Sequence, residues 1–372
     1  MATQPLLQPL QLGALALPNR VVMAPLTRMR ATPEGNVPRP INAAYYRQRA
    51  SAGLIISEAS PINAYGHGYA LTPGIHTDEQ EAGWKQVVEA VHEAGGRIFL
   101  QLWHVGRLSH PDLLPGNSLP VAPSALPGLG ESPTLEGMKA RPTPRALTTE
   151  EVEQTIIDFR HAAERAKRAG FDGVEIHGAN GYLLEQFLSD SSNHRDDRYG
   201  GSLENRARFL LQVTEQVVDV WGSDRVGIRL SPDNTHGNIA TTNRFETYRY
   251  VLEELQRFNL AYVHLVEPRV DGSQDVERES DLYARNFRPF VVGQTRLIAA
   301  GGFTRESGNA IIANGEADAV AYGRLYIANP DLPERFAADG ELNPYDRDTF
   351  YGGDEKGYLD YPFMERSALD HE

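Results

Sequence analysis

The chain contains no cysteine among its 372 residues. Disulfide bonds, thiolate zinc sites, iron–sulfur clusters and a cysteine nucleophile are therefore excluded. The sequence also lacks a surplus of basic residues, because its formal net charge is −14 at pH 7. Nucleic acid is not an expected partner, since binding to phosphates requires a basic surface.

Long apolar runs are missing as well. No stretch approaches the roughly 18 apolar residues of a membrane-spanning helix, so no membrane association is expected. Residues 1–20 lack the basic start and apolar core of a signal peptide. These absences predict a cytoplasmic location.

What is present is a globular composition, with 41% hydrophobic residues, 34 glycines and 24 prolines. Short apolar segments alternate with helix-like segments or long loops. The expected strands are 21–24, 54–56, 97–102, 173–176, 226–230, 261–265, 295–299 and 317–321. The expected helices are 41–52, 78–94, 148–168, 202–220, 244–258, 281–290 and 304–314.

This repeated alternation predicts an α/β fold with parallel strands, and eight units predict a closed (β/α)8 TIM barrel. A doubly wound open sheet is the alternative. It would require a G-x-G-x-x-G turn after an early strand, and the sequence has none.

The whole chain, 1–372, is interpreted as one barrel domain. Proline, glycine and serine dominate from about 104 to 147, where no helical or strand period survives. A loop of this length is typical of a functional segment, so we expect it to cap the site, with a short hairpin. Residues from about 340 to 372 are interpreted as a C-terminal extension.

In such a barrel, the residues that follow the strands meet at one face. Those residues are Pro25, Thr27, Ala59, Gln101, Trp103, His177, Asn180, Tyr182, Arg229, Gly301, Gly302, Gly323 and Arg324. The three glycines and Arg324 follow the last two strands, where barrel enzymes often bind phosphate. No carboxylates cluster there, so no metal site is expected.

The remaining residues at this face are neutral hydrogen-bonding groups, aromatic rings and cations. Such a lining suits a flat heteroaromatic cofactor with a phosphate tail, and FMN fits that description. Sugars and other phosphorylated ligands remain open on these grounds.

At these same positions the sequence resembles the Old Yellow Enzyme family of FMN-dependent ene-reductases. The resemblance rests on PNRVVMAPLTRMR at 18–30, HGANGYLL at 177–184 and SN at 192–193. It continues in RYGGS at 198–202, ENR at 204–206, FYGG at 350–353 and GY at 357–358. Matches run from about residue 5 to 362, and Thr27 places the chain with the branch that has threonine rather than cysteine there.

The resemblance implies a role for each site residue. Thr27 would bond the flavin O4, and Pro25, Ala59 and Gln101 would line the ring. Arg229 would lie near N1 and O2. Four residues would lie at the phosphate of the cofactor: Gly301, Gly302, Gly323 and Arg324. His177 and Asn180 would bind the substrate carbonyl oxygen, and Tyr182 would donate the proton. Trp103, Tyr69 and Tyr351 would shape the substrate pocket.

The implied reaction uses NADPH or NADH to reduce FMN, which then reduces a small α,β-unsaturated carbonyl compound such as an enone or maleimide, or a nitro compound. The protein would act as a monomer or homodimer. A flavin-free barrel enzyme acting on a phosphorylated metabolite is the alternative, and a non-catalytic flavin-storing protein is a third possibility.

Overall fold

The computed structural model describes residues 4–271, 274–275 and 280–365. Eight parallel strands close into a barrel with the order β10-β11-β12-β15-β16-β3-β4-β5. They are β3 (Val21–Met23), β4 (Leu54–Pro61), β5 (Ile98–Trp103), β10 (Gly173–His177), β11 (Val226–Leu230), β12 (Tyr262–Val266), β15 (Arg296–Ala300) and β16 (Ala319–Tyr322). The predicted (β/α)8 barrel is confirmed, and the open sheet is wrong.

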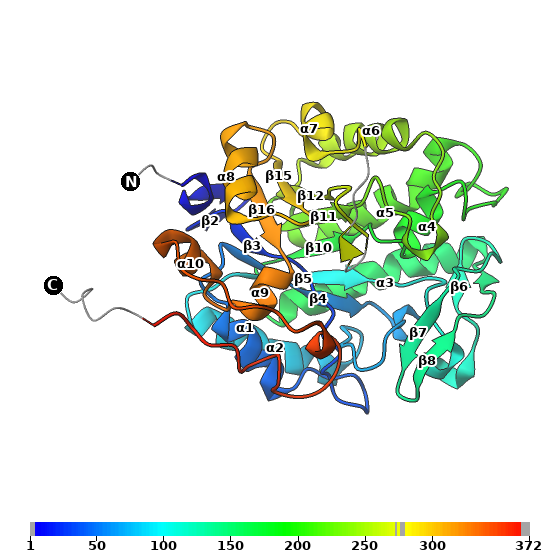
Figure 1. The fold of residues 1–372 in the computed structure, drawn as a ribbon. Helices are drawn as coiled ribbons and strands as arrows, with labels where there is room; N and C mark the ends of the chain where they lie inside the picture. The colour runs from blue at the N-terminus through cyan, green and yellow to red at the C-terminus, as the bar shows by residue number, and fades with distance from the viewer. Residues whose placement is uncertain (1–3, 272–273, 276–279, 366–372) are drawn as a thin grey trace.

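Helices surround the barrel on the outside (Figure 1). The helices that follow barrel strands are α1 (Pro40–Gln48), α2 (Asp78–Glu93), α3 (Thr149–Arg168), α5 (Leu203–Trp221), α6 (Arg244–Leu255), α7 (Ala284–Phe287) and α8 (Arg305–Ala313). Shorter helices are α4 (Leu183–Leu188), α9 (Arg324–Ala328) and α10 (Leu332–Ala338). The helix expected over 281–290 is shorter than predicted. Its α-helical part, α7, covers only Ala284–Phe287, and a 3-10 turn follows at Arg288–Phe290.

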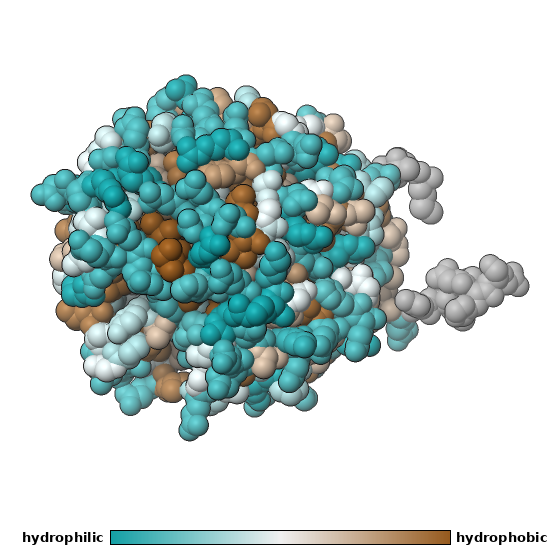
Figure 2. All heavy atoms as spheres, turned by 180° about the vertical axis from the view of Figure 1, so that it is seen from behind, coloured by the Kyte–Doolittle hydropathy of each residue, from teal (hydrophilic) through white to brown (hydrophobic). Residues whose placement is uncertain are grey.

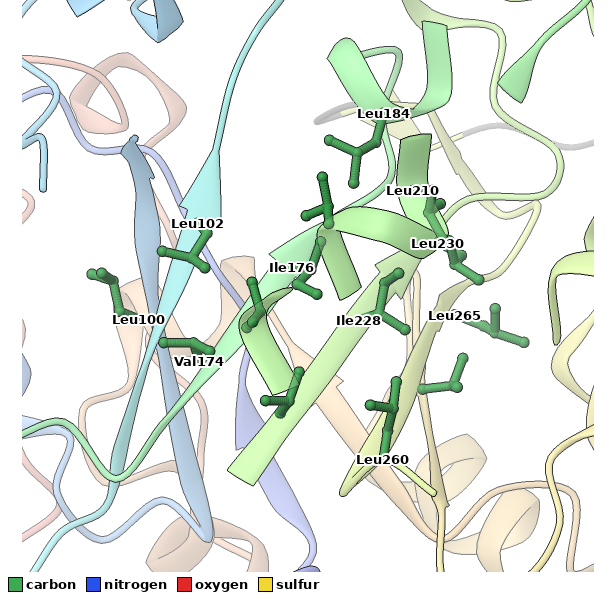
Figure 3. Close-up of a cluster of buried hydrophobic side chains, with 14 of the residues drawn as sticks. Leu100, Leu102, Val174, Ile176, Leu184, Leu210, Ile228, Leu230, Leu260 and Leu265 are labelled. Carbon is green, nitrogen blue, oxygen red and sulfur yellow. The ribbon is translucent and has the colours of Figure 1, made fainter. Parts of the chain in front are cut away.

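The strands place alternate side chains on opposite sides of the barrel wall. Leu100, Leu102, Val174 and Ile176 point outward and join the hydrophobic cluster beneath the helices (Figure 3). Their neighbours Gln101 and Glu175 therefore point into the barrel. This alternation makes the outer core apolar and leaves the interior free for polar side chains.

An N-terminal hairpin that was not predicted supplies apolar side chains to the barrel interior. It consists of β1 (Leu10–Leu12) and the antiparallel β2 (Leu15–Leu17). Its four leucines are buried in one cluster with interior residues such as Val22 and Ile56. Each buried leucine contributes about 2 kcal/mol to the free energy of unfolding.

The segment from about 104 to 147 contains the expected short hairpin, formed by β7 (Glu131–Thr134) and β8 (Gly137–Ala140). A short parallel pair, β6 (Val121–Ala122) and β9 (Arg145–Ala146), lies on either side of it in sequence. A further two-residue pair, β13 (Val270–Asp271) and β14 (Gln274–Asp275), follows β12. The expected C-terminal extension is described to residue 365, and 366–372 lie outside the described residues.

Most of the face drawn in Figure 2 is hydrophilic, and its hydrophobic residues form small groups. Among the described residues, no helix combines the length and apolar character that crossing a membrane requires.

Candidate active site

A cavity of about 580 Å³ lies where the predicted strand-end residues converge. All of the predicted site residues line it: Pro25, Thr27, Ala59, Tyr69, Gln101, Trp103, His177, Asn180, Tyr182, Arg229, Gly301, Gly302, Gly323, Arg324 and Tyr351. They come from strands around the whole barrel and from the C-terminal segment. The structure therefore brings together every residue selected from the sequence.

One side of the cavity, which we call the aromatic side, is formed by Tyr69, Trp103, His177, Asn180 and Tyr182. The Trp103 and His177 rings are stacked at 6.3 Å, and Tyr182 packs edge-on against both. The Tyr182 hydroxyl lies 2.9 Å from the Tyr69 hydroxyl. These contacts fix the rings relative to one another.

Burial determines the protonation states of His177 and Tyr182 on this side. It lowers the pKa of His177 well below 6.5, and the nearby Arg229 and His264 act in the same direction. It raises the pKa of Tyr182 well above 10, with a further contribution from Tyr69. His177 is therefore neutral and Tyr182 keeps its proton.

The neutral His177 can be assigned a tautomer. The backbone N–H of Ala179 donates to His177 Nδ1 at 3.3 Å. Because Nδ1 accepts, the ring proton lies on Nε2, which is then the available donor.

Asn180 lies in a strained turn directly after β10. Its φ is +58°, in the left-handed region that asparagine tolerates better than most residues. Its backbone N–H donates to Ser231 Oγ at 2.8 Å, and the next N–H, of Gly181, donates to Glu185 at 2.6 Å. Glu185 also accepts from Ser231, Asn234 and Tyr248. These hydrogen bonds to the Asn180–Gly181 backbone were not predicted from the sequence. The only signal for them was the polar start of the loop after the fifth barrel strand.

The opposite side of the cavity, which we call the glycine–arginine side, is formed by Gly301, Gly302, Gly323 and Arg324. Gly301 and Gly302 have φ values of +116° and +67°. A Cβ atom on Gly301 would lie 3.1 Å from the carbonyl oxygen of Glu267. A side chain at Gly301 would crowd the segment after β12, and both glycines adopt a backbone conformation that other residues rarely adopt.

Two buried groups are consistent with a planar polar ligand between these sides. Among the described residues, Arg229 Nε and Trp103 Nε1 are buried and have no hydrogen-bond partner. Burial lowers the pKa of Arg229, whereas the charge of Glu175 raises it. With Thr27 and Gln101 beside them, these groups fit the hydrogen-bonding edges of a flavin ring, and the glycine–arginine side fits its phosphate.

The C-terminal segment reaches this cavity because two buried arginines hold it. Arg28 donates to the carbonyls of Phe350 and Gly357, and Arg30 donates to those of Thr349 and Asp354. Tyr351 follows Phe350 at the cavity, with 52% of its surface exposed. The resemblance had pointed to the motifs at 350–353 and 357–358 and to Tyr351, but nothing in the sequence showed that the two arginines of the 18–30 motif hold this segment.

The model of the NADH:flavin oxidoreductase / NADH oxidase family matches residues 5–343. The chain belongs to this family. FMN and a nicotinamide reductant are therefore its cofactors, as predicted, and a flavin-free enzyme is not supported.

Relatives match nearly the full length. 12-oxophytodienoate reductase 1 of Oryza sativa subsp. japonica is 48% identical, over 98% of this chain and 94% of that protein. The solved structure of morphinone reductase is 50% identical with a TM-score of 0.92, covering 97% of each chain. An old yellow enzyme homologue from Zymomonas mobilis is 41% identical with a TM-score of 0.91, over 96% of this chain and 99% of that one. The predicted resemblance to Old Yellow Enzymes is confirmed.

Proposed function

We propose that this flavin oxidoreductase is an ene-reductase that uses NADPH or NADH to reduce the carbon–carbon double bond of α,β-unsaturated carbonyl compounds. The observation that carries the proposal is the position of a neutral histidine donor and a protonated tyrosine on one side of the flavin cavity, in ring contact at 4.9 Å. Together they can bind an oxygen and protonate a carbon of the same small molecule.

The flavin would be held mainly by the glycine–arginine side and the cavity floor. Gly301, Gly302 and Gly323 leave room for its phosphate, and Arg324 offers a charged planar donor. Thr27, Gln101 and Arg229 would bond the edges of the ring, with Pro25 and Ala59 against it. When bound, FMN supplies hydride transfer from the nicotinamide and to the substrate.

His177 and Asn180 would bind the substrate carbonyl oxygen. The Nε2–H of His177 and the side-chain amide of Asn180 are neutral donors. The Ala179 N–H orients the His177 ring, and Ser231 holds the backbone from which the Asn180 side chain projects. Donors in place before the reaction stabilise negative charge that develops on the oxygen without reorganising. Both would therefore lower the barrier as well as orient the substrate.

Tyr182 would act as the acid. Burial keeps the proton on its hydroxyl, and the 2.9 Å contact with Tyr69 limits where that hydroxyl can point. Tyr69, Trp103 and Tyr351 would shape the pocket around the substrate.

The relatives support a ketone-bearing substrate, because 12-oxophytodienoate reductase and morphinone reductase are both named for a substrate that carries a ketone. A solved structure of morphinone reductase holds tetrahydroNAD. We propose cyclic enones as the first class to test. Maleimides and nitro compounds form the next classes.

The test is anaerobic turnover of the FMN-loaded protein with 2-cyclohexenone and either NADPH or NADH. We expect one cyclohexanone for each nicotinamide oxidised. An absence of cyclohexanone would contradict the proposal. Nicotinamide oxidation only when oxygen is admitted would then favour an oxidase role, and no oxidation under either condition would favour a flavin-storing role.

Three further proposals concern organisation: residues 1–372 act as one domain, the protein is a monomer or homodimer, and it is cytoplasmic. Light scattering after size exclusion measures the mass of the particle, and limited proteolysis measures whether the chain is cut into stable parts. Fractionation of the producing cell tests the location.

A further inference from the structure

A buried carboxylate lies in the barrel interior beside the cavity and is not used in the function proposed above. Glu175 on β10 is the register partner of Gln101 on β5. Both point into the barrel, because their neighbours on each strand point outward. Glu175 is completely buried. Gln101 lines the cavity, but Glu175 does not.

Three donors converge on this carboxylate. Gln101 Nε2 donates to Oε1 at 2.7 Å, and the Tyr262 hydroxyl and His264 Nδ1 donate to Oε2 at 2.9 Å each. Gly227 makes the Tyr262 contact possible, because a Cβ there would lie 2.2 Å from the tyrosine ring. The barrel thus omits one side chain so that another can reach Glu175.

A buried carboxylate costs several kcal/mol unless donors and an opposite charge compensate it. The opposite charge is Arg229, which also lines the cavity and is attracted by Glu175. Neutral residues of similar volume could fill this space without that cost. The arrangement therefore needs an explanation other than packing.

We propose that Glu175 is a positioning residue that fixes the orientation of the Gln101 amide for the flavin. A carboxylate can only accept, so it holds the NH2 group of Gln101 and leaves the amide carbonyl oxygen, Oε1, as the free acceptor. Arg229, on which the charge of Glu175 also acts, lines the same cavity, and its Nε is a buried donor without a partner among the described residues.

One acceptor and one donor that line the same cavity can match a specific chemical edge. The pyrimidine part of a flavin carries an imide N–H, at N3, beside a carbonyl. Gln101 Oε1 would accept from the N–H and Arg229 would donate to the carbonyl. With glutamine at position 175, the two amides could pair the other way round, and Gln101 would then present NH2 to the ring's N–H.

The inference rests on the proposed flavin site, and its test uses binding rather than turnover. FMN and 3-methyl-FMN, in which a methyl group replaces the N3 proton, are titrated against the apoprotein by flavin fluorescence. We expect the wild type to prefer FMN by about 30-fold, the value of one buried hydrogen bond plus an unpaired acceptor. Glu175→Gln should weaken FMN binding by about tenfold and reduce the preference for FMN over 3-methyl-FMN to less than about threefold.

Glu58→Gln is the matched control. Glu58 is also a buried glutamate on a barrel strand, but it is bonded to Tyr46 on the helix side. Both the FMN affinity and the preference should match the wild type in this variant.

Glu175→Asp covers the case in which the glutamine variant does not fold. Aspartate keeps the charge but is one methylene too short to reach all three donors, so the preference should fall to an intermediate value. A full preference in either folded Glu175 variant would overturn the inference. Failure of the wild type to bind FMN at all would instead overturn the proposed function.

Discussion

The two sides of the cavity are built on different principles. On the aromatic side, side chains satisfy one another through ring contacts and the Tyr69–Tyr182 hydrogen bond. On the glycine–arginine side, three of the four defining residues are glycines, and two of them, Gly301 and Gly302, have positive φ. The first side is held by contacts among its own side chains, whereas the second offers backbone and one cation.

The difference suggests a division of work. Groups that are fixed in advance suit charge stabilisation and proton transfer, because they need not reorganise during the reaction. A backbone cradle suits tight holding of an anion whose position does not change. Substitutions on the two sides should therefore separate chemistry from cofactor binding.

The largest effect should come from replacing both His177 and Asn180 by alanine. Each donates to a ligand oxygen, and hydrogen bonds to a charged oxygen contribute about 1.5–3 kcal/mol. We expect the dissociation constant of 4-hydroxybenzaldehyde to rise by about 1,000-fold, measured by calorimetry. The FMN affinity should stay within about threefold, since these residues lie on the aromatic side. An unchanged aldehyde affinity would contradict their assigned role.

Tyr182→Phe should slow the second half of the reaction. Removing a general acid costs about 100-fold or more, so oxidation of the reduced enzyme by 2-cyclohexenone should slow by at least that factor in stopped-flow measurements. Reduction of the enzyme by NADPH should be unaffected. Tyr199→Phe is the control, because Tyr199 is a buried tyrosine bonded to Gln212 away from the cavity. Equal slowing of both half-reactions would show that Tyr182 is not the proton donor.

Arg324→Ala tests the other side. Loss of a charge-assisted contact to the phosphate should weaken FMN binding by about 30-fold. Riboflavin has no phosphate, so its affinity should not change, and it serves as the control ligand. If the affinities for FMN and riboflavin fall equally, Arg324 supports the part of the pocket that binds the ring rather than the phosphate.

The smallest expected effect concerns pH: the rate of enone reduction should hardly depend on the protonation of His177. The pKa of His177 is held well below its usual 6.5 by burial, so His177 stays neutral as pH falls from 8 to 6. The rate of enone reduction should change by less than about twofold on its account over that range. An inflection near pH 6.5 that disappears in His177→Asn would show that the ring titrates.

Much of this arrangement could be predicted from the sequence. Short apolar runs that alternate with helix-like segments or long loops located the eight strands, and the convergence of strand ends then located the site. His177 and Arg324 were found this way although 147 positions separate them, because a closed parallel barrel brings all strand ends to one face.

Other features could not be predicted because their partners are remote in sequence. Glu175 was one polar residue inside an apolar strand, and only the barrel places Tyr262 and His264 against it. Arg28 bonds a carbonyl 322 positions away. The N-terminal hairpin did carry a local signal, since Leu10, Leu12, Leu15 and Leu17 alternate around Gly13, but the eight-strand pattern gave no place for it.

The most direct test of the two-sided cavity is a crystal structure of the protein with FMN and 4-hydroxybenzaldehyde. We predict the phosphate at Gly302, Gly323 and Arg324, and the phenol oxygen within hydrogen-bond distance of His177 Nε2 and the Asn180 amide. A phenol oxygen bound by other residues, or a phosphate on the aromatic side, would contradict the account.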